Sequence, residues 1–475
     1  MTALDRHVAL VGFMGAGKST LGPQLAERLG RRFVSVDDVV ERRSGRTVAD
    51  LFERDGEARF RELEEKAAAD VLDRRQPAVV ELGGGALGSS RTRGALDTSV
   101  FTLLVETSLD DAWSRVVGSD RPLARDEAVF RTLFDERKPA YERVADAQIT
   151  DLDGAVLACA GVALGARTLD RLGELIPGDG QVALVADRTV AGLYGARARD
   201  ALGDRLAATY EVPAGEAAKT HAEAERLWSA LRLDRTGTLV ALGGGSAIDL
   251  TGFVAATYLR GIAWTPVATT LVAQVDAAIG GKTAIDVAGG KNLVGAFWWP
   301  DRVVCDPQTL ETLPDEELDS GRAEVVKTGL LMGEEVWTLE PAQQVRRCAA
   351  FKSGICLRDP RDSGERAQLN LGHTFAHALE AAADFRLPHG RAVALGLLAA
   401  LRLSGLEEQA ALVTDVLAPE PVSVDREAAW AALARDKKSV EGSARLVLLD
   451  APGQPRWNVE LPVEDVRRAL DELIA

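Results

Sequence analysis

Histidine supplies the first candidates for chemistry in this sequence. Three of the five histidines, His373, His377 and His389, lie in one short stretch. His373 and His377 are spaced so that a helix would place both on one face, while His389 lies in a Pro-His-Gly break where a second helix can begin. Neutral imidazole is a common ligand of zinc and related ions. The sequence leaves open whether His377 is a ligand or only a neighbour, and whether the group has a purely structural role.

A carboxylate could complete such a metal site. The segment Ala-Glu-Val-Val-Lys at residues 323–327 places Glu324 and Lys327 on one side of a predicted helix. Two histidines and one glutamate that leave an open position form a known catalytic zinc arrangement. We therefore expect metal-dependent catalysis in the C-terminal part of the chain.

A second candidate site lies near the N-terminus. The apolar run at residues 7–11 is typical of a buried parallel strand, and a GxxxxGK[ST] motif follows it, before a predicted helix. Strand, glycine loop and helix are the context of a P-loop, in which backbone N–H groups and a lysine hold phosphates and a serine binds Mg²⁺. The motif predicts that Ser19 is a Mg²⁺ ligand. It also predicts that ATP or GTP is bound by Gly12, Gly15, Ala16, Gly17, Lys18, Ser19 and Thr20.

The composition places these candidates in a large α/β enzyme. The chain has 475 residues, of which 46% are hydrophobic, enough for two or three domains. Its net charge of −16 argues against a nucleic-acid partner. We expect no membrane span and no signal segment, because no apolar run is long enough and the first residues lead directly into a strand. Four cysteines without CxxC spacing indicate a reducing compartment, so a cytoplasmic protein is expected.

The remainder of the N-terminal segment supplies candidates for a phosphoryl acceptor site. Acidic residues end a predicted strand at residues 33–38, three glycines follow another strand at 83–85, and arginines stand in later predicted helices. Taken alone, the arginines could form a solvated helix face. Together with the P-loop, these pieces resemble shikimate kinase over nearly the entire segment. The resemblance implies phosphorylation of shikimate by ATP, with Asp37 orienting or deprotonating the shikimate hydroxyl and Arg121 in a lid that stabilises the transferred phosphoryl group. It implies shikimate binding by Asp37, Arg61, Gly84 and Arg137.

One position departs from the shikimate kinase pattern. That family usually has Asp-x-Asp on the second strand, whereas here the first position is Ser35, and Asp38 follows Asp37 instead. The first aspartate commonly assists Mg²⁺ through water. The departure therefore implies weaker metal binding by this strand.

The second half of the chain contains another strand that ends in glycines. Residues 238–242 are apolar and lead into Gly243-Gly244-Gly245-Ser246 at the predicted start of a helix, a geometry that can bind a pyrophosphate. The motif is not GxGxxG and is weak evidence by itself. Charged residues follow among glycines and apolar residues, which predicts a polar pocket more than a solvated loop. A dinucleotide fold followed by a helical metal region implies redox chemistry between the two.

From about residue 170 to the end, the motifs occur in the order found in 3-dehydroquinate synthase, and the second half resembles that family. The resemblance implies NAD binding by Gly243, Gly244, Gly245, Asp249, Thr269, Thr270, Asp276, Lys291 and Asn292. It implies Zn²⁺ or another divalent ion on Glu324, His373 and His389, with His377 next to the metal or on the substrate phosphate. It implies substrate binding and catalysis by Lys282, Lys327, Lys352, Arg366, Asn370, His377 and Lys437. A homodimer through this half is expected, in which Arg260 could reach the partner's site.

The implied reaction of this half converts 3-deoxy-arabino-heptulosonate 7-phosphate to 3-dehydroquinate and phosphate. NAD oxidises a ring hydroxyl that the metal acidifies, phosphate leaves, hydride returns and the carbocycle closes. Three alternatives remain: a metal-dependent alcohol or polyol dehydrogenase fused to a kinase, another sugar-phosphate cyclase fused to a kinase, and a scaffold with one degenerate half. Lys282, Lys327 and the terminal Asp-Lys-Lys at 436–438 disfavour the dehydrogenase, because simple hydride transfer needs no phosphate-binding cations.

These patterns predict an α/β protein in three parts. Residues 1–165 form a P-loop kinase domain with a parallel sheet and helices on both faces. Residues 166–310 form a Rossmann-like, NAD-binding α/β domain, and residues 311–475 form an all-α metal- and substrate-binding domain. The small apolar residues from 153 to 165 could be the closing helix of the first domain or the opening strand of the second.

Overall fold

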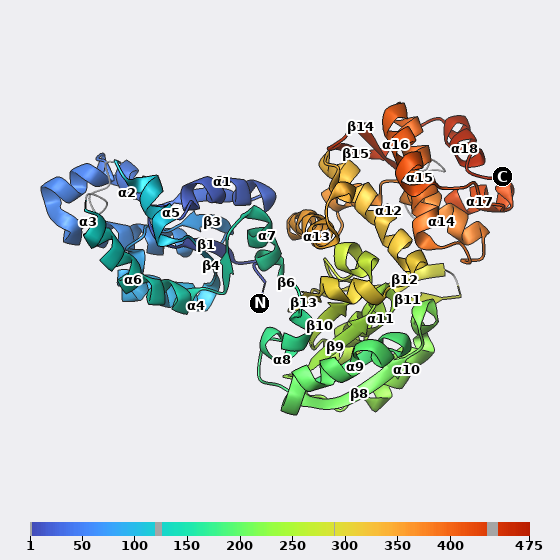
Figure 1. Cartoon of the computed structure of the whole chain (residues 1–475), viewed down its shortest axis with the longest axis horizontal. Helices are drawn as coiled ribbons and strands as arrows, with labels where there is room; N and C mark the ends of the chain where they lie inside the picture. The colour runs from blue at the N-terminus through green and yellow to red at the C-terminus, as the bar shows by residue number, and fades with distance from the viewer. Residues whose placement is uncertain (1, 119–125, 289, 435–444) are drawn as a thin grey trace. The chain divides into compact units, whose positions relative to one another are not determined.

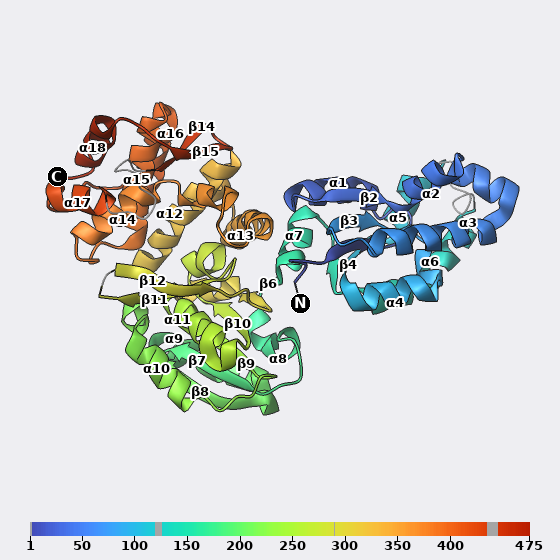
Figure 2. The same cartoon turned by 180° about the vertical axis from the view of Figure 1, so that it is seen from behind.

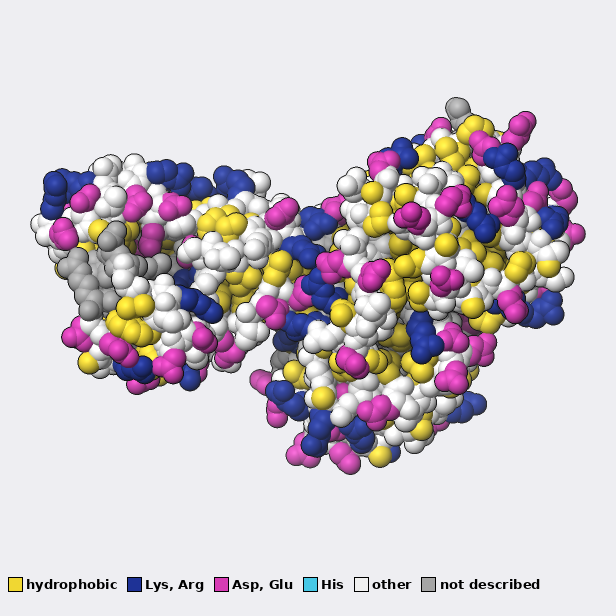
Figure 3. All heavy atoms as spheres, turned by 45° about the horizontal axis from the view of Figure 1, so that its top comes forward, with side chains coloured by type: hydrophobic (Ala, Val, Ile, Leu, Met, Phe, Trp, Pro, Cys, Tyr) yellow, Lys and Arg dark blue, Asp and Glu magenta, His cyan; other side chains and the backbone are white. Residues whose placement is uncertain are grey.

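The computed structural model describes residues 2–118, 126–288, 290–434 and 445–475. The chain forms two compact units, Met1–Gly161 and Val162–Ala475 (Figure 1). Among the described residues, no helix is long and apolar enough to cross a membrane. Acidic and basic side chains are interspersed over the faces seen in Figure 3.

The first unit is built on a five-stranded sheet in the order β2-β3-β1-β4-β5, with every neighbouring pair parallel. The central strand β1 is buried at all five positions, as expected when helices cover both faces of a parallel sheet. Figures 1 and 2 show helices on both sides of it. The strands are β1 (His7–Val11), β2 (Arg32–Ser35), β3 (Ala78–Glu81), β4 (Val100–Val105) and β5 (Ala147–Ile149). The helices are α1 (Lys18–Arg28), α2 (Val36–Ser44), α3 (Val48–Leu72), α4 (Ser90–Ser99), α5 (Leu109–Val116), α6 (Glu127–Val144) and α7 (Leu152–Ala160).

The junction contains both of the elements that its composition allowed. Helix α7 ends at Gly161, whose φ of 77° is the left-handed conformation that glycine adopts at helix ends. Strand β6 (Val162–Leu164) follows at once and pairs with β13 of the second unit. Only Gly161 separates the last helix of the first unit from the first strand of the second.

The second unit begins with a six-stranded sheet in the order β6-β13-β10-β9-β7-β8, again parallel throughout. Its strands after β6 are β7 (Val182–Asp187), β8 (Leu206–Val212), β9 (Thr238–Gly243), β10 (Ala263–Ala268) and β13 (Val303–Cys305). Its helices are α8 (Leu172–Leu175), α9 (Arg188–Leu202), α10 (His221–Ala230) and α11 (Gly245–Thr257). An antiparallel hairpin of β11 (Lys282–Val287) and β12 (Gly290–Phe297) lies between β10 and β13 in the chain.

The C-terminal part is helical and packs around its own apolar core, in which α12, α14 and α15 contribute fully buried alanine, valine and leucine side chains. The helices are α12 (Asp315–Met332), α13 (Pro341–Arg358), α14 (His373–Ala382), α15 (His389–Leu403), α16 (Glu407–Leu417), α17 (Arg426–Ala434) and α18 (Val463–Asp471). The prediction of a helical region omitted one hairpin, which consists of β14 (Leu446–Ala451) and β15 (Gln454–Val459).

Candidate active sites

The P-loop connects β1 to α1 in the first unit. Gly12, Gly15 and Gly17 have φ angles of 144°, 81° and 95°, which side chains other than glycine rarely adopt. Lys18 is buried, and its Nζ donates hydrogen bonds to the carbonyls of Gly12 at 2.7 Å and Phe13 at 3.1 Å. The lysine is thus folded over its own loop, where it can exchange these carbonyls for phosphate oxygens.

The hydroxyl that follows this lysine has a carboxylate partner. Ser19 Oγ donates a hydrogen bond of 2.7 Å to Glu81 Oε1, at the end of the adjacent strand β3. Thr20 is exposed in the first turn of α1. The sequence prediction included Ser19 but missed Glu81, because only the strand order brings the two together.

The three glycines after β3 gather the predicted acceptor residues. Arg137 Nη1 donates to the carbonyl of Gly84 at 3.0 Å. A Cβ on Gly85 would collide with the guanidinium of Arg61, and a Cβ on Gly83 would lie 3.1 Å from Asp37 Oδ1. The structure therefore brings Asp37, Arg61, Gly84 and Arg137 to one glycine-lined place, as the prediction requires.

Glu64 also belongs to this place and was not predicted. It lies on α3 one turn after Arg61, which donates to its Oε2 at 2.6 Å. Burial raises the pKa of Glu64; the Arg61 guanidinium opposes this effect, and the nearby carboxylate of Asp37 adds to it. The carboxylate holds Arg61 in position, so the arginine presents its remaining N–H groups in a fixed direction.

Two predicted residues, Arg121 and Lys437, lie outside the described residues. Their predicted roles are in the kinase lid and in the substrate site of the second unit.

In the second unit, three residues from three helices converge on a metal-binding geometry. Ligand atoms of Glu324 (α12), His373 (start of α14) and His389 (start of α15) all lie within 4.8 Å of one another. His373 Nε2 is 3.4 Å and His389 Nε2 is 3.2 Å from Glu324 Oε1. Both histidines lie at helix starts, which the sequence predicted for His389 from the proline before it and did not predict for His373.

The other nitrogen of each imidazole is already engaged. His373 Nδ1 lies 3.2 Å from the carbonyl of Leu371, and His389 Nδ1 lies 3.1 Å from Glu380 Oε1. With Nδ1–H donating to these acceptors, each imidazole would offer its Nε2 lone pair to a divalent ion bound beside Glu324, which is the arrangement of metal-binding histidines. The donor set and its second contacts therefore fit a divalent ion. Glu380 is a further functional candidate that sequence reasoning missed.

Charge around this cluster favours an ionised carboxylate. Burial would raise the pKa of Glu324, but Lys327, which forms an ion pair with it, and the two imidazoles hold the pKa well below its usual range. For His389, burial would lower the pKa, but hydrogen bonds to Glu324 and Glu380 raise it to about 10. His377 lies next to the cluster, with its ring centroid 5.5 Å from that of His373, and is not one of the three converging ligands.

A set of cations lies on the segments around this cluster. Lys352 Nζ donates to the carbonyl and Oδ1 of Asp276 at 2.7 and 2.6 Å, and burial lowers the pKa of this lysine while Asp276 opposes the shift. Lys282 Nζ donates to Asp362 at 2.6 Å. Arg366 Nη1 donates to the carbonyl of Gly280 at 2.8 Å. Asn370, just before the histidine helix, donates to the carbonyl of Ala367 at 3.0 Å.

The glycine turn after β9 opens helix α11 at Gly245. A Cβ on Gly244 would lie 2.9 Å from Thr270 Cγ2, so the backbone and Thr270 are in close contact. Thr269 is buried after β10, and its N–H donates to the carbonyl of Gly243 at 3.1 Å. The first backbone N–H groups of α11 have no partner within the helix, so a helix start of this kind can bind a phosphate group.

A buried lysine that was not predicted lies beside this turn. Lys219 Nζ donates to Asp249 Oδ2 at 2.9 Å and also to the side-chain oxygen of Asn292. Glu216, one turn earlier, forms an ion pair of 3.1 Å with Lys291. Burial raises the pKa of Asp249 to about 6, although Lys219 opposes the shift. Both missed residues follow β8, so the rule that ligands gather at the carboxyl ends of parallel strands could have found them.

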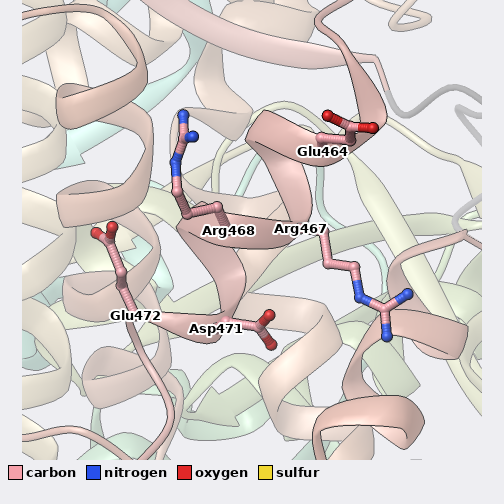
Figure 4. Close-up of a pocket in the computed structure, with 5 residues that line it drawn as sticks. All are labelled: Glu464, Arg467, Arg468, Asp471 and Glu472. Carbon is pink, nitrogen blue, oxygen red and sulfur yellow. The ribbon is translucent and has the colours of Figure 1, made fainter.

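The structure also has a pocket on the C-terminal helix α18 (Figure 4). Its lining consists of charged residues that belong to none of the sites above: Glu464, Arg467, Arg468, Asp471 and Glu472. Both of these arginines pair with neighbouring carboxylates, so we interpret it as an ion-paired surface.

These two units define a two-domain α/β enzyme with a P-loop in one domain and a carboxylate–imidazole metal centre in the other. Comparison with known families makes the assignment specific. The model of shikimate kinase matches residues 14–160, and models of the N-terminal and C-terminal parts of 3-dehydroquinate synthase match residues 209–320 and 321–439.

One relative matches nearly the whole chain, and another matches about two thirds of it. The bifunctional shikimate kinase/3-dehydroquinate synthase of Thermotoga maritima is 34% identical over 479 residues, which is 92% of this chain and 94% of the relative. The 3-dehydroquinate synthase of Symbiobacterium thermophilum is 42% identical over 349 residues, which is 65% of this chain and 96% of the relative. The chain therefore belongs to the family of bifunctional shikimate kinase/3-dehydroquinate synthases, and the resemblance and fold class predicted from the sequence are confirmed.

Solved structures support the fold of the second unit. A 2-deoxy-scyllo-inosose synthase complexed with carbaglucose-6-phosphate, NAD⁺ and Co²⁺ is 23% identical, with a TM-score of 0.60 over 66% of this chain and 96% of that one. A 2-epi-5-epi-valiolone synthase from Streptomyces hygroscopicus with NAD⁺ and Zn²⁺ is 24% identical, with a TM-score of 0.58 over the same shares.

Proposed function

We propose that the first unit transfers a phosphoryl group from MgATP to a hydroxyl of shikimate. The P-loop supplies backbone N–H groups and Lys18 for the phosphates. Arg61 and Arg137 are the cations available to the substrate carboxylate, and the glycines at 83–85 let the ring approach the backbone. Asp37 stands at the same glycines and accepts the proton of the attacking hydroxyl.

The second unit is proposed to convert 3-deoxy-arabino-heptulosonate 7-phosphate to 3-dehydroquinate and phosphate. Its residues fit a divalent ion at Glu324, His373 and His389 and a dinucleotide at the turn of residues 243–245. When bound, the ion would acidify a substrate hydroxyl and NAD would supply reversible hydride transfer. The relatives with NAD⁺ and with Zn²⁺ or Co²⁺ support this choice of cofactors.

The chain's own residues then bind and orient the substrate. The cations Lys282, Lys352 and Arg366 offer charge-assisted hydrogen bonds to the phosphate and carboxylate of the heptulosonate. In the structure their partners are Asp362, Asp276 and a backbone carbonyl, so substrate binding exchanges these contacts. Lys327 keeps Glu324 ionised for the metal, while Asn370 and His377 extend the polar lining beside it.

A homodimer is proposed through the second unit. Leu259 and Arg260 have φ angles of 52° and 67° in a short turn, and Leu259 is an exposed large apolar side chain there. A partner subunit covering this turn would bury Leu259 and accept Arg260 into its site. Analytical ultracentrifugation of the full chain and of Leu259→Glu tests this arrangement, with dissociation expected for the variant.

The convergence of Glu324, His373 and His389 within 4.8 Å carries the proposal for the second unit. It is tested by assaying the full chain with the heptulosonate phosphate, NAD and Zn²⁺, and separately with shikimate and MgATP. We expect phosphate release without net NADH in the first assay and shikimate-dependent ADP in the second. Stoichiometric NADH without phosphate release would instead identify a dehydrogenase and exclude the cyclisation.

A further inference from the structure

The contact between Ser19 and Glu81 is not explained by the residues assigned so far. Ser19 lies in the first turn of α1, directly after the P-loop lysine, and its Oγ donates to Glu81 Oε1 at 2.7 Å. Glu81 is the last residue of β3, the strand between β1 and β2. A hydroxyl that offers its lone pairs to a cation must direct its proton elsewhere. Glu81 accepts the hydrogen bond of this hydroxyl, which leaves the lone pairs of Ser19 Oγ available to a metal ion.

The shikimate kinase pattern places a carboxylate on β2, but here β2 ends in Ser35. Ser35 ends β2 and is the register partner of Glu81, so the two side chains lie on neighbouring strands and the same face of the sheet. The Ser35 hydroxyl instead caps α2, where it accepts a hydrogen bond from the N–H of Asp38 at 3.3 Å. Asp38 itself is exposed in the first turn of α2. The carboxylate hydrogen-bonded to the P-loop serine therefore comes from β3.

We infer that Glu81 is the residue that positions Mg²⁺ in the nucleotide site of the first unit, in place of a carboxylate on β2. Mg²⁺ prefers hard oxygen ligands and keeps several waters, and P-loop enzymes hold it between the P-loop Ser or Thr and an acidic residue from a nearby strand. Glu81 meets both requirements: it is half-buried, it contacts Ser19, and it brings one negative charge to the phosphate end of the loop. The inference rests on the proposed kinase function.

The charge of Glu81 can be tested separately from its hydrogen bond. In Glu81→Gln the amide oxygen still accepts from Ser19, so a purely structural contact survives while the charge is lost. The full chain is titrated with ADP, with and without Mg²⁺, by isothermal calorimetry. We expect unchanged ADP affinity without metal and a loss of roughly 10- to 100-fold in Mg²⁺ affinity with ADP, the scale seen when supporting groups of a metal site are removed. Glu62→Gln, which removes an exposed carboxylate paired only with Arg59 in the structure, is the matched control and should match the wild type.

A compensating substitution sharpens the test. Ser35→Asp in the Glu81→Gln background returns a carboxylate to the register partner, and aspartate caps a helix as well as serine does. We expect this double variant to recover most of the Mg²⁺ affinity. If Glu81→Gln binds Mg²⁺ with ADP within about twofold of the wild-type affinity, the loss is far smaller than expected. That result overturns the inference and leaves the kinase proposal standing. A wild-type chain that forms no ADP from MgATP in the presence of shikimate overturns the kinase proposal and with it this inference.

Discussion

The turns after β1 and β9 both lead from a strand through glycines into a helix, but they need glycine for different reasons. Gly17 has a φ of 95°, and a Cβ there would meet nothing within 4 Å. Gly244 has a φ of −82° and a ψ of −173°, which any residue can adopt, yet its Cβ would lie 2.9 Å from Thr270 Cγ2. The first glycine is required by conformation and the second by lack of space.

The same contrast extends to the charges of the two sites. In the first unit, Lys18 is held by backbone carbonyls of its own loop. In the second, Lys327 and Lys352 are buried in ion pairs with Glu324 and Asp276. A loop built from local backbone is recognisable from a short motif, whereas pairs between distant segments are visible only in the folded chain.

The largest expected effect tests whether the two sites act independently. Lys18→Ala removes the proposed phosphate-binding cation and should lower shikimate phosphorylation by roughly 100-fold or more, while His373→Ala removes a proposed metal ligand and should lower phosphate release by a similar factor. Each activity is measured in both variants, together with bound zinc. Loss of both activities in either variant would contradict separate sites.

The effect of substituting Gly244, the glycine required by lack of space, should be reversed by a second substitution at Thr270. Gly244→Ala should weaken NAD binding roughly tenfold, since forcing a methyl group into a packed site costs about 1–3 kcal/mol. Thr270→Ser removes the Cγ2 atom and keeps the hydroxyl that accepts from the N–H of Ala273, so the double variant should recover most of the affinity. The measurement is NAD titration by fluorescence, with Thr270→Ser alone as the control. Failure of the rescue would mean that backbone conformation also limits this turn.

Substitutions of Gly17, the glycine required by its backbone conformation, should differ according to how well the new residue tolerates that conformation. Gly17→Ala should destabilise the loop by about 1–2 kcal/mol, the cost of a left-handed residue with a Cβ. Gly17→Asn should be milder, because asparagine tolerates this conformation better. Thermal melting and ADP titration of the full chain give the ranking. Equal effects of alanine and asparagine would point to a steric origin instead.

The smallest effect is a pH dependence at the second turn. Burial raises the pKa of Asp249 from 3.8 to about 6, so the folded chain retains a proton that the unfolded chain releases. Stability contributed by this group is therefore present below pH 3.8 and lost as the pH rises towards 6. If the ionised carboxylate binds the NAD ribose, NAD affinity should fall about fourfold from pH 7.5 to pH 5.5, following the fraction ionised. Asp249→Asn should bind weakly with no such slope, and an unchanged slope would exclude Asp249 as its source.

Local motifs accounted for much of the fold and part of the sites. The P-loop could be predicted because strand, glycines, lysine and helix are contiguous. The helix of His373 and His377 could be predicted from their spacing, and the start of the next helix from Pro388. The choice of His389 over His377 as a ligand came from family resemblance, and the geometry places His389 in the cluster. Spacing alone could not decide it, because it says nothing about how α14 and α15 meet.

Contacts that depend on strand order could not be predicted. Glu81 reaches Ser19 because β3 lies between β1 and β2, although 62 residues separate the two in the chain. Lys219 reaches Asn292 because a hairpin folds back beside the sheet. The position of Lys219 after β8 could have marked it as a candidate, but its partner, like that of Glu81, is fixed only when the sheet is assembled.

Strand β6 has a practical consequence for anyone who wishes to express the two enzymes separately. Because Val162–Leu164 begins immediately after Gly161 and pairs with β13, a cut after residue 165 would leave an orphan strand on the kinase fragment. The same cut would remove the edge strand of the synthase sheet and expose the backbone hydrogen-bonding groups of β13, which could then pair with other chains. Gene fission between Gly161 and Val162 keeps each set of strands whole.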